Sequence, residues 1–346
     1  MIVRSEEIVK QAASWQAAGQ KVAFATVVKT WGSSPRPVGS QLVINDDRKF
    51  AGSVSGGCIE GAVVGEAAKV IGGEPPKTLK FNVTDGEAMN IGLTCGGSVS
   101  VYISALNPGG ILPELNIQLL KRTPLSTVTK LSTGQRNLIT GDQVSGPLTL
   151  PDTLVTAARD AFTNRTCTTL HDDGGDGDGE EYFIHSYPPA PRIFIVGAGH
   201  ISQALVPMAS TAGFDVTVID PRTAFITTER FPETELAPVW PDEFLRDNKP
   251  DSSTAVVTLV HDPKIDDPAL EIAIRSDAFY VGALGSRGTH SKRVERFTTN
   301  NYSADELARI KAPIGLDLGG RKPAEIAVSI LAEIIQVWTG RSDKAP

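Results

Sequence analysis

The 346-residue sequence has few cysteines, no run of basic residues and no long apolar stretch. Three cysteines are a low and odd number, which indicates reduced thiols and excludes a disulfide scaffold. The net charge of −7, without a Lys/Arg cluster, argues against nucleic-acid binding, because phosphate contact needs a concentrated basic surface. No stretch reaches membrane-spanning length, and the N-terminus has early acids instead of an apolar signal-peptide core. We therefore expect a cytoplasmic protein with neither a membrane nor a nucleic-acid partner.

The first half of the chain mixes strand and helix patterns. The whole chain of 346 residues is too long for one ordinary hydrophobic core, which predicts two domains. Segments rich in β-branched residues alternate with short helical patterns up to residue 186. We predict a mixed α+β domain over residues 1–186. The proline-rich segment "YPPAPR", residues 187–192, then predicts a linker.

The second half opens with the pattern of a dinucleotide-binding βαβ unit. "RIFIVGAGHIS" places a strand before a glycine turn and a helix. Gly197 would make the tight turn, Gly199 would admit a phosphate, and Ser202 replaces the usual third glycine. Asp220 ends the next strand, where such folds bind a ribose hydroxyl. Residues 193–346 are therefore predicted to form a Rossmann-like, doubly wound α/β domain.

Polar residues follow the two later apolar strands of this predicted domain. They are His261, Asp262, Ser286 and Arg287. Ligands bind outside the carboxyl ends of strands in open α/β sheets, so these residues should share a crevice with the glycine turn, His200 and Asp220. His200 and His261 could donate to an anion or move a proton, but two histidines without a third ligand make a poor zinc site. Structural roles for both histidines, and an Arg287–Asp262 ion pair, are the alternatives.

A second glycine turn precedes the terminal helix. Gly319 and Gly320 stand before Pro323, which predicts a helix start and a second candidate anion cradle. An isoleucine stripe then follows one face of the helix. The stripe could complete the core of its own domain or support a homodimer.

A glycine-flanked cysteine is the main candidate for chemistry in the first half. Cys58 follows Ser55, Gly56 and Gly57 and is expected to open a helix over residues 58–71. Free amide groups and the helix dipole at such a position favour thiolate over thiol. A thiolate there could be a soft metal ligand or a sulfur acceptor. The alternative is a small buried hydrophobic residue, as most free cysteines are.

The other two cysteines give weaker patterns. Cys95 precedes Gly96 and Gly97 in a similar turn, but no helix start would activate its thiol. Cys167 stands on a predicted strand, and we expect a buried structural residue.

An acidic, glycine-rich segment covers residues 171–181. It contains no apolar residue to bury and lacks the acid spacing of a calcium-binding EF-hand loop. We expect an exposed hairpin tip or solvated loop, with metal binding as the less favoured alternative.

Several long motifs resemble those of the XdhC/CoxI family, the accessory proteins of molybdenum hydroxylases such as xanthine dehydrogenase. The motifs are "GSSPRPVGSQLVI", "GSVSGGCIEGAV", "TCGGSVSVYI", "IVGAGHIS", "VIDPR", "HDPKIDDPAL", "YVGALGSRGT" and "PIGLDLGGRKPAEIAVSILAEI". The resemblance implies a cytoplasmic chaperone that binds and protects the molybdenum cofactor and supports its sulfuration. It further implies delivery to the large subunit of an apo-hydroxylase, with a cysteine desulfurase as a second partner.

The resemblance favours a role in the site for Cys58, which would contact molybdenum or sulfur. Arg36 stands between two prolines on a stiffened loop, and its planar guanidinium group could bind a phosphate or pterin oxygen. An exposed loop arginine is the alternative. Such a maturation chaperone is not expected to be an enzyme. Two other function classes stay open: an NAD(P)-dependent oxidoreductase and a non-catalytic module that senses a nucleotide. A Rossmann fold alone does not establish chemistry.

Overall fold

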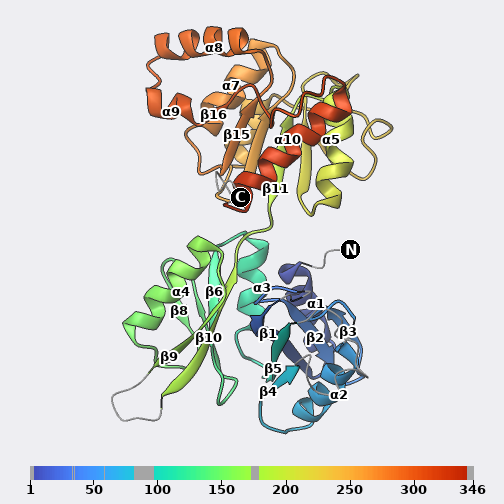
Figure 1. Ribbon diagram of the computed structural model, residues 1–346, viewed down its shortest axis with the longest axis vertical. Coiled ribbons are helices and arrows are strands. Elements are labelled where there is room, and N and C mark those ends of the chain that lie inside the picture. The colour runs from blue at the N-terminus through green and yellow to red at the C-terminus, as the bar shows by residue number, and fades with distance from the viewer. Residues whose placement is uncertain are drawn as a thin grey trace. The chain divides into compact units, whose positions relative to one another are not determined.

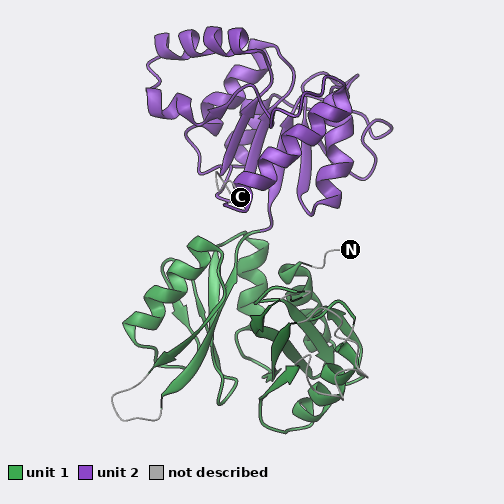
Figure 2. Cartoon of the chain, in the orientation of Figure 1, with its two compact units in different colours: residues 1–189 green, residues 190–346 purple. Residues whose placement is uncertain are grey.

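The computed structural model describes residues 4–32, 34, 36–57, 59–81, 97–172 and 179–340. Cys58, Cys95 and Gly96 lie outside these residues. The chain divides into two compact units, residues 1–189 and 190–346 (Figure 2). This division falls within the segment predicted as a linker, between the end of one strand at Tyr187 and the start of the next at Arg192.

The first unit contains two antiparallel five-stranded sheets (Figure 1). The first sheet has the order β3-β2-β1-β5-β4 and the second β8-β7-β6-β10-β9. The strands of the first sheet are β1 (Val22–Trp31), β2 (Gln41–Asn45), β3 (Phe50–Gly52), β4 (Lys77–Phe81) and β5 (Ser98–Leu106). Those of the second are β6 (Leu125–Lys130), β7 (Arg136–Ile139), β8 (Val144–Ser145), β9 (Thr168–Asp172) and β10 (Glu180–Tyr187).

Helices bury the apolar faces of these two sheets. They are α1 (Ser5–Ala17), α2 (Glu60–Ile71), α3 (Leu112–Leu120) and α4 (Asp152–Asn164). Val63 and Ala67 of α2 are fully buried in the core of the first sheet, and Ala158 of α4 is fully buried in that of the second. The prediction of a mixed α+β domain is confirmed.

The predicted helix over residues 58–71 begins two residues later than expected. Gly56 and Gly57 have φ of +82° and +120°, so the backbone cannot enter a right-handed helix there. Ile59 forms the N-cap and Glu60 is the first helical residue. Cys58 itself lies outside the described residues.

The acidic segment joins two paired strands. β9 and β10 are antiparallel, with Asp172 opposite Glu180, as the hairpin interpretation predicts. Residues 173–178 lie outside the described part of the chain. Within that part, no three His, Cys, Asp or Glu residues are grouped so that they could hold a metal ion.

The second unit is a parallel six-stranded sheet with the order β13-β12-β11-β14-β15-β16. Its strands are β11 (Arg192–Val196), β12 (Asp215–Ile219), β13 (Glu235–Ala237), β14 (Thr254–Thr258), β15 (Tyr280–Ala283) and β16 (Ile310–Lys311). The strand order reverses between β11 and β14, which is the topological switch point of a doubly wound fold. The predicted Rossmann-like architecture is therefore confirmed.

Helices cover both faces of this sheet (Figure 1). α5 (His200–Thr211) and α10 (Pro323–Trp338) pack on one face. The other face is covered by α6 (Pro241–Asp247), α7 (Pro263–Ala273), α8 (Arg287–Thr299) and α9 (Ala304–Ala308). Among the described helices, none combines the length and apolar character needed to cross a bilayer.

The terminal helix α10 contributes to the core of its own unit. Ile330 and Ile334 are fully buried, in the same cluster as residues of α5. This packing accounts for the isoleucine stripe without a second chain. A homodimer stays a prediction.

Candidate functional site

The turn before α2 is organised around the carboxylate of Glu60. Ser53 and Ser55 donate hydroxyl hydrogen bonds to it at 2.8 and 2.6 Å. The backbone N–H groups of Val54, Ser55 and Gly57 also donate to it, at 3.2, 3.0 and 2.9 Å. Burial alone would raise the pKa of Glu60, but the hydrogen bonds from Ser55 and Ser53 lower it to about 2. Glu60 is therefore a fixed anion that holds the turn closed.

The predicted residues of this turn have different roles. Ser55 is buried and holds Glu60, so its hydroxyl is not available to a ligand. Gly56 and Gly57 are exposed, and an added Cβ would meet no atom within 4 Å at either position. A ligand can thus approach this backbone immediately before Cys58. Gly97 is buried directly before β5 and follows the undescribed Cys95 and Gly96.

Arg36 stands on the loop between β1 and β2. Its Nε atom is buried and has no hydrogen-bond partner among the described residues. The Ser34 hydroxyl donates to the carbonyl oxygen of Arg36 at 2.9 Å, which fixes the backbone of this loop. A guanidinium nitrogen without an acceptor is suited to bind a ligand oxygen.

Cys167 has the environment of a structural thiol. It precedes β9, and burial raises its pKa to about 11. Its Sγ atom would lie 2.6 Å from a Cβ added at Gly39, which has a φ of +92°. Cys167 is therefore packed tightly against the loop before β2 and is mostly protonated at neutral pH.

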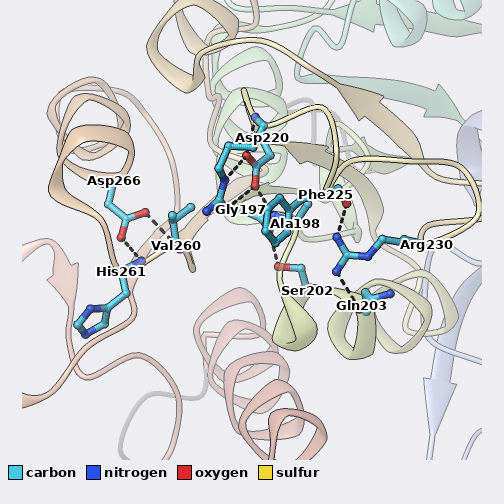
Figure 3. A network of polar contacts seen from close by, with 11 residues as sticks. Gly197, Ala198, Ser202, Gln203, Asp220, Phe225, Arg230, Val260, His261 and Asp266 are labelled. Carbon is cyan, nitrogen blue, oxygen red and sulfur yellow. Dashed lines mark hydrogen bonds and ion pairs between the residues drawn. The ribbon is translucent and has the colours of Figure 1, made fainter.

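The glycine turn of the second unit has the geometry that its sequence predicts. Gly197 has a φ of +107°, and an added Cβ would lie 2.6 Å from Cγ2 of Val260. Gly199 is the N-cap of α5, with open space where a Cβ would be. His200 is the first helical residue and is exposed. Ser202 is fully buried and donates to the Gly197 carbonyl, so its hydroxyl closes the turn (Figure 3).

Asp220 is bound to the protein itself instead of facing an open ribose site. Its Oδ2 accepts from the Ala198 backbone nitrogen at 2.8 Å (Figure 3). The same oxygen accepts from Nη2 of Arg222 at 2.7 Å. Its Oδ1 accepts from the Arg222 backbone nitrogen and from Nε, both at 2.9 Å. Burial opposes ionisation, but Arg222 and these N–H donors lower the pKa of Asp220. A ribose hydroxyl would have to displace one of these partners, and a phosphate at Ala198 would meet a carboxylate.

The second predicted anion cradle also contains a carboxylate of the protein. Glu325 accepts from the backbone N–H groups of Arg321 and Lys322 at 2.9 and 3.1 Å, and these hydrogen bonds lower its pKa. A Cβ added at Gly320 would lie 2.5 Å from Cβ of Glu325. The turn at Gly319 and Gly320 thus serves the start of α10.

The chain after β14 is held by a buried acid. His261 has a φ of +69°, and its backbone N–H donates to Asp266 at 2.9 Å (Figure 3). The Val260 N–H donates to the same carboxylate at 3.4 Å. Burial raises the pKa of Asp266 to about 7. His261 follows the carboxyl end of β14, and its positive φ is unusual for a residue other than glycine.

Two of the predicted residues at strand ends are helix N-caps. Asp262 accepts from the Lys264 backbone nitrogen at 3.0 Å and caps α7. Ser286 accepts from the Thr289 backbone nitrogen at 3.2 Å and caps α8. Arg287 is exposed, and the described residues contain no Arg287–Asp262 ion pair.

One pocket of about 460 Å³ lies between the ends of β14 and β15. Its lining residues are His261, Pro263, Ser286, Gly288, Thr289, Lys292, Arg293 and Arg296. Of the predicted crevice residues, the structure brings His261 and Ser286 together here. Those that do not line it are Gly197, Gly199, His200, Asp220, Asp262 and Arg287.

Sequence reasoning missed several charged residues of these sites. Among them are Glu60, Glu325, Asp266, Arg293 and the role of Arg222 as the partner of Asp220. One of them carried a detectable signal: Asp266 occupies a position on the buried, otherwise apolar face of α7. A charged residue on a buried helix face needs partners, which indicates a polar site.

Models of known protein families match both halves of the chain. One described as the XdhC and CoxI family matches residues 15–82, and one described as the XdhC Rossmann domain matches residues 193–334. Together they span more than half of the sequence.

Individual relatives align along nearly the whole chain. The molybdenum cofactor insertion chaperone PaoD of Escherichia coli is 27% identical over 320 residues, which cover 92% of this chain and 84% of PaoD. A probable xanthine dehydrogenase subunit of Bacillus subtilis is 26% identical over 323 residues, which cover 92% of this chain and 93% of that protein. A Bacillus halodurans protein solved as a xanthine dehydrogenase superimposes with a TM-score of 0.71 at 25% identity, covering 98% of both chains. On these matches, and on motifs spread over both units, the chain belongs to the XdhC/CoxI family.

Proposed function

We propose that this protein is an accessory chaperone that binds the molybdenum cofactor, protects it, supports its sulfuration and inserts it into a molybdenum hydroxylase. Relatives named as a molybdenum cofactor insertion chaperone and as a xanthine dehydrogenase subunit support this role. In this function the cofactor is cargo that the chain binds and releases. Turnover chemistry of its own is not required.

The observation that carries the proposal is the closed turn before Cys58. Five hydrogen bonds to Glu60 fix the turn, while Gly56 and Gly57 stay exposed. Cys58 follows this turn directly in the sequence, so a ligand of its thiol would meet a backbone that is fixed before binding. Such preorganisation lowers the entropy that a ligand must remove on binding.

The residues of the first unit fit the chemistry of the cargo. Cys58 and Cys95 would supply soft thiolate sulfur to molybdenum or accept sulfur, and Arg36 has a buried Nε without a partner for a phosphate or pterin oxygen. Gly56 and Gly57 leave an exposed backbone surface directly before Cys58, while their own N–H groups are engaged by Ser53 and Glu60. All five residues belong to motifs of the family.

We further propose that the chaperone acts in the cytoplasm, where its few cysteines would stay reduced. Its protein partners would be the large subunit of an apo molybdenum hydroxylase and a cysteine desulfurase. The acidic composition, at a net charge of −7, supports a protein partner over a nucleic acid.

The test is to express the protein in a host that makes molybdenum cofactor, purify it without oxygen, and quantify molybdenum and released pterin per chain. The wild type and Cys167→Ala should retain both, whereas Cys58→Ala should lose most of both without unfolding. Cys167→Ala is the matched control because it removes the buried thiol of the same unit. Equal retention in Cys58→Ala and the wild type would remove the thiol from the site, and no cofactor in any variant would contradict the carrier function.

A further inference from the structure

The pocket at the ends of β14 and β15 differs from the glycine turns before α2, α5 and α10. The turns before α2, α5 and α10 each contain a carboxylate of the chain itself, from Glu60, Asp220 and Glu325. Each carboxylate accepts backbone N–H groups that would otherwise be free for an anion. An external phosphate would have to displace a tethered acid at any of them.

A buried arginine lines the pocket and has N–H donors that the described residues do not use. The Arg293 side chain is 3% exposed and lines the pocket, yet its Nη1 has no hydrogen-bond partner among the described residues. Its Nε has no hydrogen bond either and lies 3.6 Å from Oδ1 of Asp267, which is an ion-pair distance. Nη2 makes one hydrogen bond of 3.3 Å, to the Leu284 carbonyl. Buried guanidinium groups with unused N–H donors are unfavourable unless a ligand or water accepts from them.

The start of α8 adds backbone donors to the same pocket. Ser286 caps the helix by accepting from Thr289, and the backbone N–H of Gly288 has no acceptor in the described structure. Gly288 lines the pocket, and a Cβ there would meet nothing nearer than 3.8 Å. A negatively charged group can therefore approach this N-terminus, which carries the positive end of the helix dipole.

The charges around the pocket favour an anion. Lys292 and Arg296 are exposed at its edge beside Arg293. The nearby acids are already engaged: Asp267 pairs with Arg296 at 2.7 Å, and Asp266 accepts the His261 N–H. Among the described residues Lys292 makes no ion pair, so its charge is not neutralised by the protein.

We propose that this pocket binds a phosphate or diphosphate group, as carried by a nucleotide. The ligand oxygens would accept from Arg293, Lys292 and the N-terminal amides of α8, instead of from the glycine turn after β11. The volume of about 460 Å³ admits a diphosphate with part of an attached nucleoside. The site does not depend on the proposed chaperone function, because it requires no molybdenum and lies wholly in the second unit.

The experiment is calorimetric titration of the full chain with pyrophosphate, ADP and adenosine. We expect pyrophosphate and ADP to bind and adenosine to bind much more weakly. Lys292→Ala should weaken binding about 3-fold, because it removes a charge-assisted contact. Adding Arg296→Ala should weaken binding about 10-fold or more, because it removes a second positive charge at the edge and leaves Asp267 without this partner. Both side chains are exposed, so these variants should fold.

Two control variants locate the site. Lys249→Ala removes an exposed lysine of the same unit outside the pocket, and Gly199→Asp adds a charge at the glycine turn. Both should bind as the wild type does. Tighter binding of ADP than pyrophosphate would identify a nucleotide site, and equal binding would identify a site for the free anion.

Three results would overturn the proposal. The first is no binding of either phosphate compound by the wild type. The second is loss of binding in Gly199→Asp with the Lys292 and Arg296 variants unchanged, which would place the anion at the glycine turn. The third is an equal loss in Lys249→Ala, which would indicate unspecific attraction to surface charge.

Discussion

The Oδ2 atom of Asp220 lies 2.8 Å from the backbone nitrogen of Ala198, in the turn between β11 and α5. This carboxylate therefore accepts a backbone hydrogen bond in the turn that the sequence predicts to bind a dinucleotide. Nη2 of Arg222 lies 2.7 Å from the same Oδ2 atom and neutralises the charge of the carboxylate. The acid that would bind ribose in a typical dinucleotide site here holds the glycine turn in shape.

Asp220→Ala should destabilise the second unit by about 2–3 kcal/mol, because it leaves the buried Ala198 N–H and the Arg222 guanidinium without their acceptor. Urea denaturation of both proteins measures this difference. Asp242→Ala, which removes an exposed ion pair with Arg246, is the control and should change stability by less than about 0.5 kcal/mol. Equal effects of the two variants would show that the Asp220 contacts contribute little.

Glu60→Gln should change the pH dependence of stability. The pKa of Glu60 is about 2 in the folded protein and 4.5 in the reference state, so its ionised form favours folding above the reference pKa. This contribution, about 2–3 kcal/mol near neutral pH, is lost as the pH falls from about 5 toward 2. Unfolding free energies measured in steps from about pH 6 to pH 3 should therefore converge for the wild type and the variant. A difference that stays constant with pH would contradict the assigned pKa.

Gly197→Ala and Gly199→Ala should differ sharply in stability. At Gly197 the positive φ and a Cβ 2.6 Å from Val260 would strain the turn, for a loss of about 2–4 kcal/mol. At Gly199 the backbone is extended and the space is open, so the change should be within about 0.5 kcal/mol. Thermal unfolding of both variants tests this contrast. Similar melting temperatures would mean that the turn relaxes around the added methyl group.

Cys167 should react slowly with thiol reagents in the folded protein. A pKa of about 11 leaves roughly 0.1% thiolate at about pH 8, and the side chain is mostly covered. Alkylation with iodoacetamide followed by peptide mass spectrometry should find Cys167 unmodified until the protein is denatured. Modification at the rate of a free thiol would show that the Gly39 loop opens readily.

The architecture was largely predictable from local patterns. The apolar strand at residues 192–196, the glycine turn after it and Asp220 at the end of the next strand together identify the βαβ opening. Each of these features is local, because strand, turn and helix preferences depend on neighbouring residues. The same reasoning placed the start of the helix after Gly57 two residues too early, because residue preferences do not fix the cap position; here Ile59 is the N-cap and Glu60 is the first helical residue.

The candidate sites were predictable only in part. The glycine turns are visible in the sequence, but the sequence does not show that acids of the chain itself bind their N–H groups. Each acid accepts from a backbone N–H group elsewhere in the sequence. The separation along the chain is three residues for Glu60, four for Glu325 and twenty-two for Asp220. Arg293 was missed for a related reason, since its role depends on burial against α7 and on the pocket beside it.

The sequence by itself determined the family, the two-part organisation and the positions of the glycine turns, because these depend on residue types at fixed spacings along the chain. Tertiary structure alone decided which turns are already filled by a carboxylate and which pocket keeps unused donors. The physical reason is that a hydrogen bond or an unpaired buried charge depends on distance and solvent exposure in three dimensions. Asp220 and Arg293 show both outcomes in one unit. Asp220 is a predicted ligand contact that binds the protein itself, and Arg293 is an unpredicted buried arginine that lines a pocket.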